Sequence, residues 1–313
     1  MVTNLYVTKR CNLRCRYCYP PGNEPESNTS ILLSLLKKIR PHNPALNLTG
    51  GEPLVYEGLG LLLREAKRLQ FYPILLSTNA LLIDRIINDL HLIDHLIFSL
   101  DSLDEGVNDM ICGVKGSTRE VIKNIKRCAA LSRGNGLQLS VHSVITPETI
   151  DGIEEIICFC EDLGIAFTLS PEHGRFCPSE ALFENNRYVE LINRLINLKR
   201  RGKPITSSFS YLRTIRNFSD HQCYPFVSPR VQPDGKVYFP CEAKKERHVY
   251  LQDFKSLYRL MQQEGELTVG PECTRRCFLA CFLEVEAYIR RPLAIFEEKH
   301  MRQWVFGKRG RLS

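Results

Sequence analysis

Short apolar runs alternate with amphipathic stretches along the first two thirds of the chain, and no other sequence feature limits the fold as strongly. Runs with the length of buried strands lie at 5–8, 46–49, 74–77, 95–100, 137–143 and 166–170. Helical spacing occurs at 30–40, 58–69, 82–90, 117–132, 147–163 and 187–200. We expect a capping box of Ser117 and Glu120 to start the fourth helix. Strands alternating with helices predict an α/β fold with a parallel sheet, here a partial (β/α)6 barrel.

The alternation stops near residue 203, where a Lys-Pro pair and a polar stretch follow. The segments 227–231 and 236–239 then predict two short strands joined by the turn Pro233-Asp234-Gly235. A helix is compatible with 273–289, and 299–313 is basic. We therefore expect a barrel core over 1–205, a small Cys-rich hairpin-plus-helix extension over 206–290, and a basic tail over 291–313.

Thirteen cysteines are many for 313 residues, and the composition indicates how to interpret them. A hydrophobic share of 43% and a charged share of 25% are globular values, and a net charge of +7 is mild for a nucleic-acid binder. No apolar run reaches the roughly 18 residues of a membrane span, and the first residues lack a signal-peptide pattern. We therefore expect a cytoplasmic protein, in which clustered cysteines indicate metal or catalysis rather than disulfides.

Three cysteines follow the first strand in the sequence Cys-Asn-Leu-Arg-Cys-Arg-Tyr-Cys, as Cys11, Cys15 and Cys18. Three thiolates on one loop can hold three irons of a [4Fe–4S] cluster and leave the fourth iron open for chemistry. Zinc sites more often close with four ligands, and ferredoxin-type clusters use four cysteines. The loop therefore predicts a cluster with an open iron, and a zinc knuckle or buried thiols are the alternatives.

Polar motifs follow the next strands. They include Gly50-Gly51-Glu52-Pro53, Ser77-Thr78-Asn79, the segment 98–102 with Ser99 and Asp101, and His142 on the fifth strand. In α/β proteins ligands bind where the carboxyl ends of parallel strands meet. Two glycines allow the backbone to approach a ligand closely, and Glu52 can accept a hydrogen bond from an ammonium group. The alternatives are a tight turn at 50–53 and a surface cap at Asp101.

Together, the three-cysteine loop, the GGEP sequence and the strand-end segments resemble the radical S-adenosylmethionine (SAM) superfamily. In that family the open iron binds SAM, and an electron from the cluster yields a 5′-deoxyadenosyl radical that abstracts hydrogen from a substrate. The resemblance implies that the cluster ligands are Cys11, Cys15 and Cys18. It implies SAM contacts from Tyr17, Gly50, Gly51, Glu52, Pro53, Ser77, Thr78, Asn79, Ser99 and Asp101, with His142 as a candidate for SAM or substrate. Position 80 is Ala where the family has Gly, so the turn there can differ.

Five cysteines lie in the last third of the chain: Cys223, Cys241, Cys273, Cys277 and Cys281. The first two flank the hairpin, which resembles the opening of the SPASM and twitch extensions that hold auxiliary [4Fe–4S] clusters. Five cysteines fit one such cluster; we favour Cys223, Cys241, Cys273 and Cys277 as its ligands, with Cys281 as the rival, so one of Cys273, Cys277 and Cys281 is spare. The last three share one face if that segment is helical. A structural zinc on the same thiols is the alternative. Of the rest, Cys112 is interpreted as a buried thiol rather than a catalytic one.

These features predict a radical SAM enzyme, an oxidoreductase or transferase, that abstracts hydrogen from (or adds to) a small-molecule or lipid-like metabolite in a biosynthetic pathway. The first strand begins by residue 5, so we expect no N-terminal peptide-recognition domain, and a maturase of ribosomally made peptides is the runner-up. A non-catalytic iron–sulfur scaffold is a third hypothesis, against which the intact motifs argue. The resemblance implies an electron donor such as flavodoxin or ferredoxin, and the chain carries no dedicated nucleic-acid module.

Overall fold

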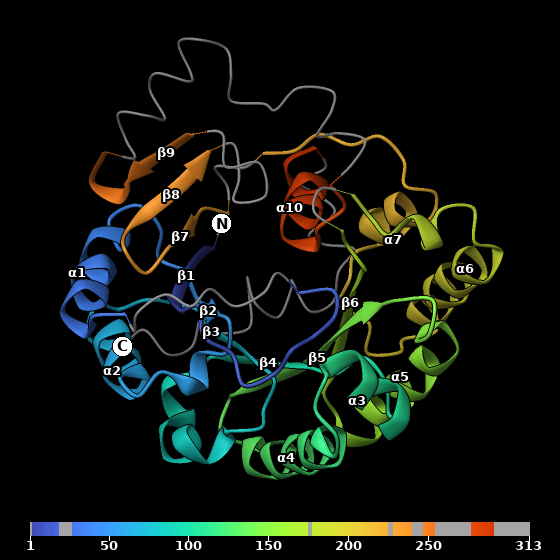
Figure 1. The fold of residues 1–313 in the computed structure, drawn as a ribbon, viewed down its shortest axis with the longest axis horizontal. Coiled ribbons are helices and arrows are strands. Elements are labelled where there is room, and N and C mark those ends of the chain that lie inside the picture. The colour runs from blue at the N-terminus through green and yellow to red at the C-terminus, as the bar shows by residue number, and fades with distance from the viewer. Residues whose placement is uncertain are drawn as a thin grey trace.

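A parallel sheet forms the centre of the molecule in the computed structural model, which describes residues 2–18, 27–174, 177–224, 228–239, 247–253 and 277–290. Its first six strands are adjacent in chain order: β1 (Thr3–Thr8), β2 (Leu46–Gly50), β3 (Ile74–Thr78), β4 (His95–Ser99), β5 (Gln138–Ile145) and β6 (Ala166–Pro171). Helices lie around the outside (Figure 1): α1 (Thr29–Ile39), α2 (Leu59–Arg68), α4 (Ser117–Ser132), α5 (Ile153–Leu163) and α6 (Asn186–Arg200). The predicted partial α/β barrel is confirmed.

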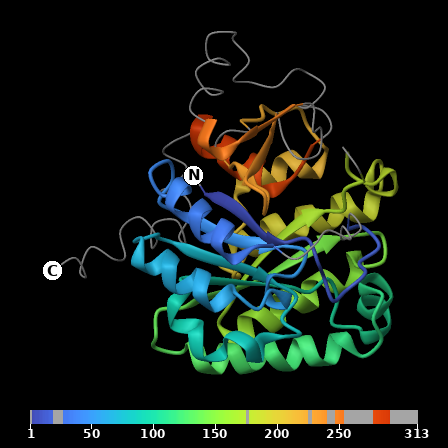
Figure 2. The same ribbon diagram turned by 60° about the vertical axis from the view of Figure 1, so that its left-hand side comes forward.

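The sheet continues beyond the barrel. Strand β7 (Arg230–Val231) pairs parallel to β1, and the antiparallel strands β8 (Lys236–Phe239) and β9 (Arg247–Tyr250) follow. The predicted hairpin is therefore present, and it extends the barrel sheet to nine strands (Figures 1 and 2). Helix α10 (Ala280–Arg290) lies across from this hairpin.

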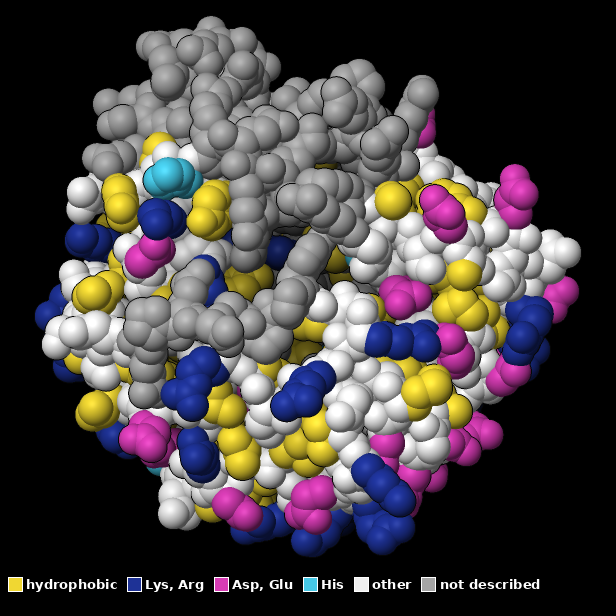
Figure 3. All heavy atoms as spheres, in the orientation of Figure 1, with side chains coloured by type: hydrophobic (Ala, Val, Ile, Leu, Met, Phe, Trp, Pro, Cys, Tyr) yellow, Lys and Arg dark blue, Asp and Glu magenta, His cyan; other side chains and the backbone are white. Residues whose placement is uncertain are grey.

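Some elements differ from the prediction. Helices α3 (Glu105–Cys112) and α7 (Phe209–Arg216) were not predicted, and the segment Ile83–Leu92 is a 3-10 helix. Helix α10 begins at Ala280, so Cys277 precedes it and does not share a helix face with Cys281. None of the helices within the described ranges is both long enough and apolar enough to cross a membrane. Basic and acidic side chains alternate over the face seen in Figure 3, which is hollowed near its centre.

The two faces of the strands differ in chemistry, because side chains alternate along a strand. Outward-facing side chains such as Leu5, Leu48 and Leu76 are 0% exposed and pack in the hydrophobic core with the helices. The intervening residues, among them Asn4, Asn47 and Ser77, are half-buried and form the inner face of the barrel. This inner face carries these polar groups together with Leu75 and Ile97, and it leads to the carboxyl edge where the candidate site lies.

The capping box predicted for α4 is wrong. The residue before the helix is Gly116 in a left-handed conformation, with φ of 79° and no side-chain cap, and Ser117 is buried inside the first turn. The cap comes instead from Asp109 on α3, whose carboxylate accepts hydrogen bonds from the Gly116 N–H, the Thr118 N–H at 2.9 Å and the Ser117 hydroxyl at 3.1 Å. Partial burial opposes ionisation, but these bonds outweigh it and lower the pKa of Asp109 to about 2.

Replacing Asp109 by Ala should therefore lower the free energy of unfolding by about 1 kcal/mol, the usual value of a lost helix cap. Since the folded pKa lies below the ordinary value, the contribution is present above about pH 4 and is lost as the pH falls towards 2. Denaturant titration at pH 7 and pH 3 measures both effects. The matched control is Asp151→Ala, which removes an exposed ion pair with Arg187 and should change stability little. Equal losses in the two variants would contradict the capping role.

Candidate active site

The loop that carries Cys11, Cys15 and Cys18 leaves β1 at the carboxyl edge of the sheet. Two of its backbone N–H groups bind the carboxyl end of α3: Arg14 donates to the Cys112 carbonyl at 2.9 Å and Arg16 to the Ile111 carbonyl at 3.0 Å. Within the loop, Cys18 N–H donates to the Cys15 carbonyl at 3.0 Å. The helix that sequence analysis missed thus supports the second half of the loop.

All three thiols of the loop are free and lie close enough to affect one another. Burial raises the pKa of Cys11 to about 11, and the charges of Cys15 and Cys18 add to this shift. A hydrogen bond with the Cys112 thiol is the main cause of the raised pKa of Cys15, followed by burial. Burial also raises the pKa of Cys18. The thiols are therefore protonated at neutral pH, and binding of iron there releases protons.

Three thiols on one loop are suitable donors for an iron–sulfur cluster. Across the described part of the chain, however, no three His, Cys, Asp or Glu side chains already converge closely enough to hold a metal ion. Cys15 instead contacts Cys112, which is 9% exposed and also accepts a weak bond from the Asn108 amide at 3.7 Å. The donor set fits the cluster chemically, and the Cys15 side chain is engaged elsewhere.

Gly50 and Gly51 allow the backbone at the end of β2 to pack directly against the backbone at the start of the cysteine loop. The Gly51 N–H donates to the Thr8 carbonyl at 2.9 Å, and the Glu52 N–H donates to the Arg10 carbonyl at 2.8 Å. A Cβ on Gly50 would lie 2.1 Å from the Thr8 oxygen, and one on Gly51 would lie 2.3 Å from the Arg10 oxygen. The close approach expected at these glycines is therefore made, in this structure, to the neighbouring backbone.

Glu52 connects the ends of β2 and β3. Its carboxylate accepts hydrogen bonds from the Leu54 N–H at 2.9 Å, the Thr78 hydroxyl at 2.7 Å and the Asn79 N–H at 2.7 Å. Burial raises its pKa to about 7 although these bonds lower it, and the residue is 1% exposed. Glu52 thus has a structural task in addition to the predicted contact with SAM. The next residue, Pro53, is buried and starts a 3-10 turn.

The end of β3 reaches the cysteine loop directly. The Asn79 side-chain amide donates to Asn12 Oδ1 at 2.8 Å, between the first two cysteines. Ala80 is buried in a left-handed conformation with φ of 65°, and its N–H donates to Thr78 Oγ1 at 3.0 Å. The turn therefore keeps the conformation that glycine adopts most readily, despite the alanine. Sequence analysis missed Asn12, which nothing but its place inside the loop could have indicated.

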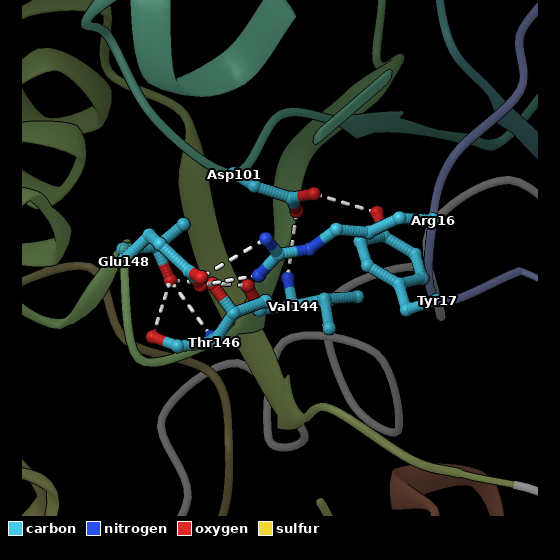
Figure 4. Close-up of polar contacts among 7 residues, drawn as sticks. Arg16, Tyr17, Asp101, Val144, Thr146 and Glu148 are labelled. Carbon is cyan, nitrogen blue, oxygen red and sulfur yellow. Dashed lines mark hydrogen bonds and ion pairs between the residues drawn. The ribbon is translucent and has the colours of Figure 1, made fainter. Parts of the chain in front are cut away.

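The end of β4 fixes the aromatic residue of the loop. The Tyr17 hydroxyl donates to Asp101 Oδ2 at 2.6 Å, and Asp101 Oδ1 accepts from the Val144 N–H of β5 at 2.8 Å (Figure 4). Burial raises the pKa of Asp101 to about 6. Asp101 is 2% exposed, which contradicts the surface-cap alternative. Ser99 is exposed at the same edge, and His142 Nε2 shares a hydrogen bond with Ser170 Oγ at 3.1 Å.

An ion pair that the sequence did not reveal joins the cysteine loop to the segment after β5. The Arg16 guanidinium donates to both carboxylate oxygens of Glu148, from Nη1 to Oε1 at 2.9 Å and from Nη2 to Oε2 (Figure 4). Thr146 Oγ1 donates to the same carboxylate at 2.8 Å. Arg16 is the main cause that lowers the pKa of Glu148 to about 2. The loop is thus fastened to β3, β4, α3 and the segment after β5.

The second cysteine group is described in part. Cys223 is buried and Cys277 is half-buried, whereas Cys241 and Cys273 lie outside the described residues and Cys281 is described only by its backbone in α10. The segments around Cys223 and Cys277 meet: the His221 and Phe278 rings lie 4.8 Å apart, and the Gln222 N–H donates to Glu286 at 2.8 Å. His173 Nε2, after β6, accepts from the Phe278 N–H at 3.0 Å.

The fold and the thiol loop define a class of α/β-barrel proteins with an iron–sulfur loop after the first strand. A family model described as the radical SAM superfamily matches residues 5–160, which contain the loop and the motifs on β2 to β5. The chain belongs to the radical SAM superfamily, as the sequence predicted. Membership implies a [4Fe–4S] cluster that binds SAM.

Two curated relatives are 27% identical to this chain. One is the probable GTP 3′,8-cyclase of Methanococcus aeolicus, matched over 170 residues, which are 51% of this chain and 55% of the relative. The other is the pre-heme d1 synthase of Dinoroseobacter shibae, matched over 171 residues, or 51% and 40%. The chain thus spans about half the length of the curated relatives it matches.

Solved structures share the fold. The structure of anSMEcpe with bound S-adenosylmethionine aligns with a TM-score of 0.66 at 17% identity, over 96% of this chain and 97% of its own. SuiB of Streptococcus suis bound to S-adenosylmethionine aligns with a TM-score of 0.64 at 18% identity, over 81% and 65%. At these identities the comparison shows the fold alone.

Replacing Gly51 by Ala should displace the cysteine loop, because the new Cβ would lie against the Arg10 carbonyl. We expect a loss of about 3 kcal/mol in unfolding free energy, at the upper end for a point substitution, and a lower iron content after reconstitution. Denaturant titration and iron analysis measure these. In the control, Gly152→Ala, the added Cβ meets only Ser102 Oγ at 3.6 Å. A normal iron content in the Gly51 variant would contradict the prediction.

Replacing Arg16 by Gln should leave the cluster in place but slow SAM cleavage. Because both groups are partly exposed, we expect the pair to contribute about 1 kcal/mol, equivalent to about fivefold in rate. Arg16→Lys should not restore the rate, since an ammonium cannot bond both oxygens as a guanidinium does. The measurement is 5′-deoxyadenosine release per cluster, with Arg187→Gln on the outside of the barrel as control. An unchanged rate in the Arg16 variant would refute this role.

Proposed function

We propose that this chain cleaves SAM reductively at a [4Fe–4S] cluster held by Cys11, Cys15 and Cys18, and uses the resulting radical to abstract hydrogen from a bound substrate. The observation that carries the proposal is the attachment of a three-thiol loop to four neighbouring segments at one edge of the sheet. A non-catalytic scaffold does not need such fixed geometry or the polar strand ends around it.

The chain's own residues would bind and orient SAM. When bound, the cluster supplies an open iron and an electron. The backbone at 50–53, the hydroxyls and amide of 77–79, and Ser99 lie along the edge beside the loop, where we propose that they contact SAM. The Tyr17 hydroxyl donates to Asp101, and we propose that its ring packs beside the adenine, as the family pattern implies. His142 remains a candidate for SAM or substrate.

We propose one auxiliary [4Fe–4S] cluster on four of the five C-terminal cysteines, Cys223, Cys241, Cys273, Cys277 and Cys281. Two contacts support it: His221 against Phe278 and Gln222 with Glu286 bring the segments around Cys223 and Cys277 together. The hairpin between Cys223 and Cys241 continues the barrel sheet, so a cluster there would lie on the barrel side rather than on a detached domain. Such a cluster could take an electron from the product radical.

The substrate we propose is a small-molecule metabolite converted in an oxidoreductase or transferase reaction, with the electron supplied by a flavodoxin or ferredoxin. A peptide is the second candidate, because anSMEcpe, solved with S-adenosylmethionine and a Cp18Cys peptide, aligns over 95% of this chain. The curated relatives point instead to small molecules, since one is named for GTP and the other for pre-heme d1.

Iron and sulfide analysis after anaerobic reconstitution tests both clusters. We expect about eight irons per chain, falling to about four in the Cys11/Cys15/Cys18→Ala variant, which should also release no 5′-deoxyadenosine from SAM. About four irons falling to none, with one zinc per chain throughout, would make the second cysteine group a structural zinc site. SAM left intact by the fully loaded wild type would refute the proposed activity.

A further inference from the structure

The inner face of the barrel is lined with hydrogen-bonding side chains below the SAM edge. On one side Asn4 donates to Ser228 at 3.0 Å, Asn47 donates to Asn4 at 2.8 Å, and Ser77 donates to Asn47 at 3.3 Å. We call Asn4, Asn47 and Ser77 the polar wall. On the other side His95 bonds Ser140 at 2.8 Å, and Thr168 bonds Ser207 at 3.1 Å. Members of the polar wall are half-buried, and Leu75 and Ile97, paired in register with Asn47 and Ser77, share this face with them.

Most polar side chains of this face are uncharged at neutral pH. Burial lowers the pKa of both His95 and His142 to about 4, so the two imidazoles are neutral. Two strand residues of this face carry charge among those described: Arg230 on β7, and Lys236 on β8, which lies opposite Gln232 and forms an ion pair with Asp234. A substrate group placed here therefore meets mainly neutral donors and acceptors.

Gln232 is a buried side chain whose carboxamide has no partner. The register pairs Leu5 with Val231, and both belong to the outward hydrophobic core. Alternation therefore places the next residue, Gln232, on the inner face beside Tyr6. Its side chain is 1% exposed, and neither Oε1 nor Nε2 has a hydrogen-bond partner. Buried polar groups in folded proteins are nearly always satisfied, so an unpaired donor and acceptor on one side chain require an explanation.

We propose that Gln232 is a substrate-recognition residue that pairs with an amide group. Its N–H would donate to the substrate carbonyl, and its oxygen would accept from the substrate N–H, in the two-point pairing that one carboxamide makes with another. The substrate class is then a polar molecule with a secondary amide, either a peptide bond or the lactam edge of a heterocycle, rather than a lipid-like metabolite. This inference rests on the proposed function, because it assigns the substrate of the same barrel.

The test uses the reconstituted full chain with SAM and two probes, N-acetylglycine N-methylamide and uracil. Binding is measured by saturation-transfer NMR, with the fully N-methylated glycine diamide as the probe that lacks N–H donors. The variant Gln232→Met keeps the shape and removes the polar atoms. We expect at least one probe to bind wild type and to bind this variant at least fivefold more weakly, and the methylated probe to bind neither.

We also expect Gln232→Met to raise the melting temperature of the unliganded protein by a few degrees, because an unpaired buried carboxamide is removed. A merely structural glutamine would give a lower melting temperature instead. Gln252→Met, at an exposed glutamine bonded to Lys38, is the matched control and should change neither readout. The melting comparison keeps the proposal testable without any ligand.

Each outcome decides one point. Gln232-dependent binding of the glycine diamide alone identifies a peptide-type amide, and of uracil alone a heterocyclic lactam. The proposal is overturned if neither probe binds wild type, if binding survives in Gln232→Met, if the methylated probe binds equally, or if that variant melts at a lower temperature. Neither binding nor melting requires turnover. Failure to cleave SAM would therefore contradict the proposed function, whereas the role of Gln232 is decided by probe binding and melting temperature alone.

Discussion

The close contact between the β2 end and the start of the cysteine loop is the constraint on which the rest of the site depends. Two consecutive glycines let the backbone N–H groups of Gly51 and Glu52 donate to the carbonyls of Thr8 and Arg10. A Cβ at Gly50 or Gly51 would lie 2.1 or 2.3 Å from one of these carbonyl oxygens, which is far inside van der Waals contact. Because the loop starts in this fixed position, its later residues reach the ends of β3, β4 and α3. The thiols are thereby held at the one edge of the sheet where ligands gather.

The two buried carboxyl groups at this edge both have hydrogen-bond partners in the chain. Glu52 accepts three hydrogen bonds, and Asp101 accepts from Tyr17 and from the backbone of β5. Burial disfavours the charged form of both carboxyls and so raises their pKa, while the hydrogen bonds favour the charged form and reduce that rise. The Arg16–Glu148 pair lies nearer to solvent and serves geometry more than stability, since exposed ion pairs contribute little. The cysteine loop is therefore held at this edge by buried hydrogen bonds and by one partly exposed ion pair.

The barrel strands present two chemistries through one alternation. Their outward side chains are mostly apolar and pack against helices, while the inward set combines amides, hydroxyls and neutral imidazoles with Tyr6, Leu75 and Ile97. The loss of inner apolar packing is offset by hydrogen bonds among those side chains. That arrangement presents polar groups next to the edge at which we propose that the radical forms. The unpaired Gln232 carboxamide is where this internal pairing is incomplete.

The sequence by itself determined the six βα units, the thiol loop and the polar strand ends, because strand and helix periodicity and loop spacing are local properties. It also predicted the hairpin at its Pro-Asp-Gly turn. It did not reveal α3, because that short helix lacks a long apolar period, and it misplaced the cap of α4. Only the tertiary structure decided contacts between distant residues: Arg16 with Glu148, 132 residues apart, and β7 beside β1. Such contacts depend on how packed elements bring residues together, and no local pattern encodes that.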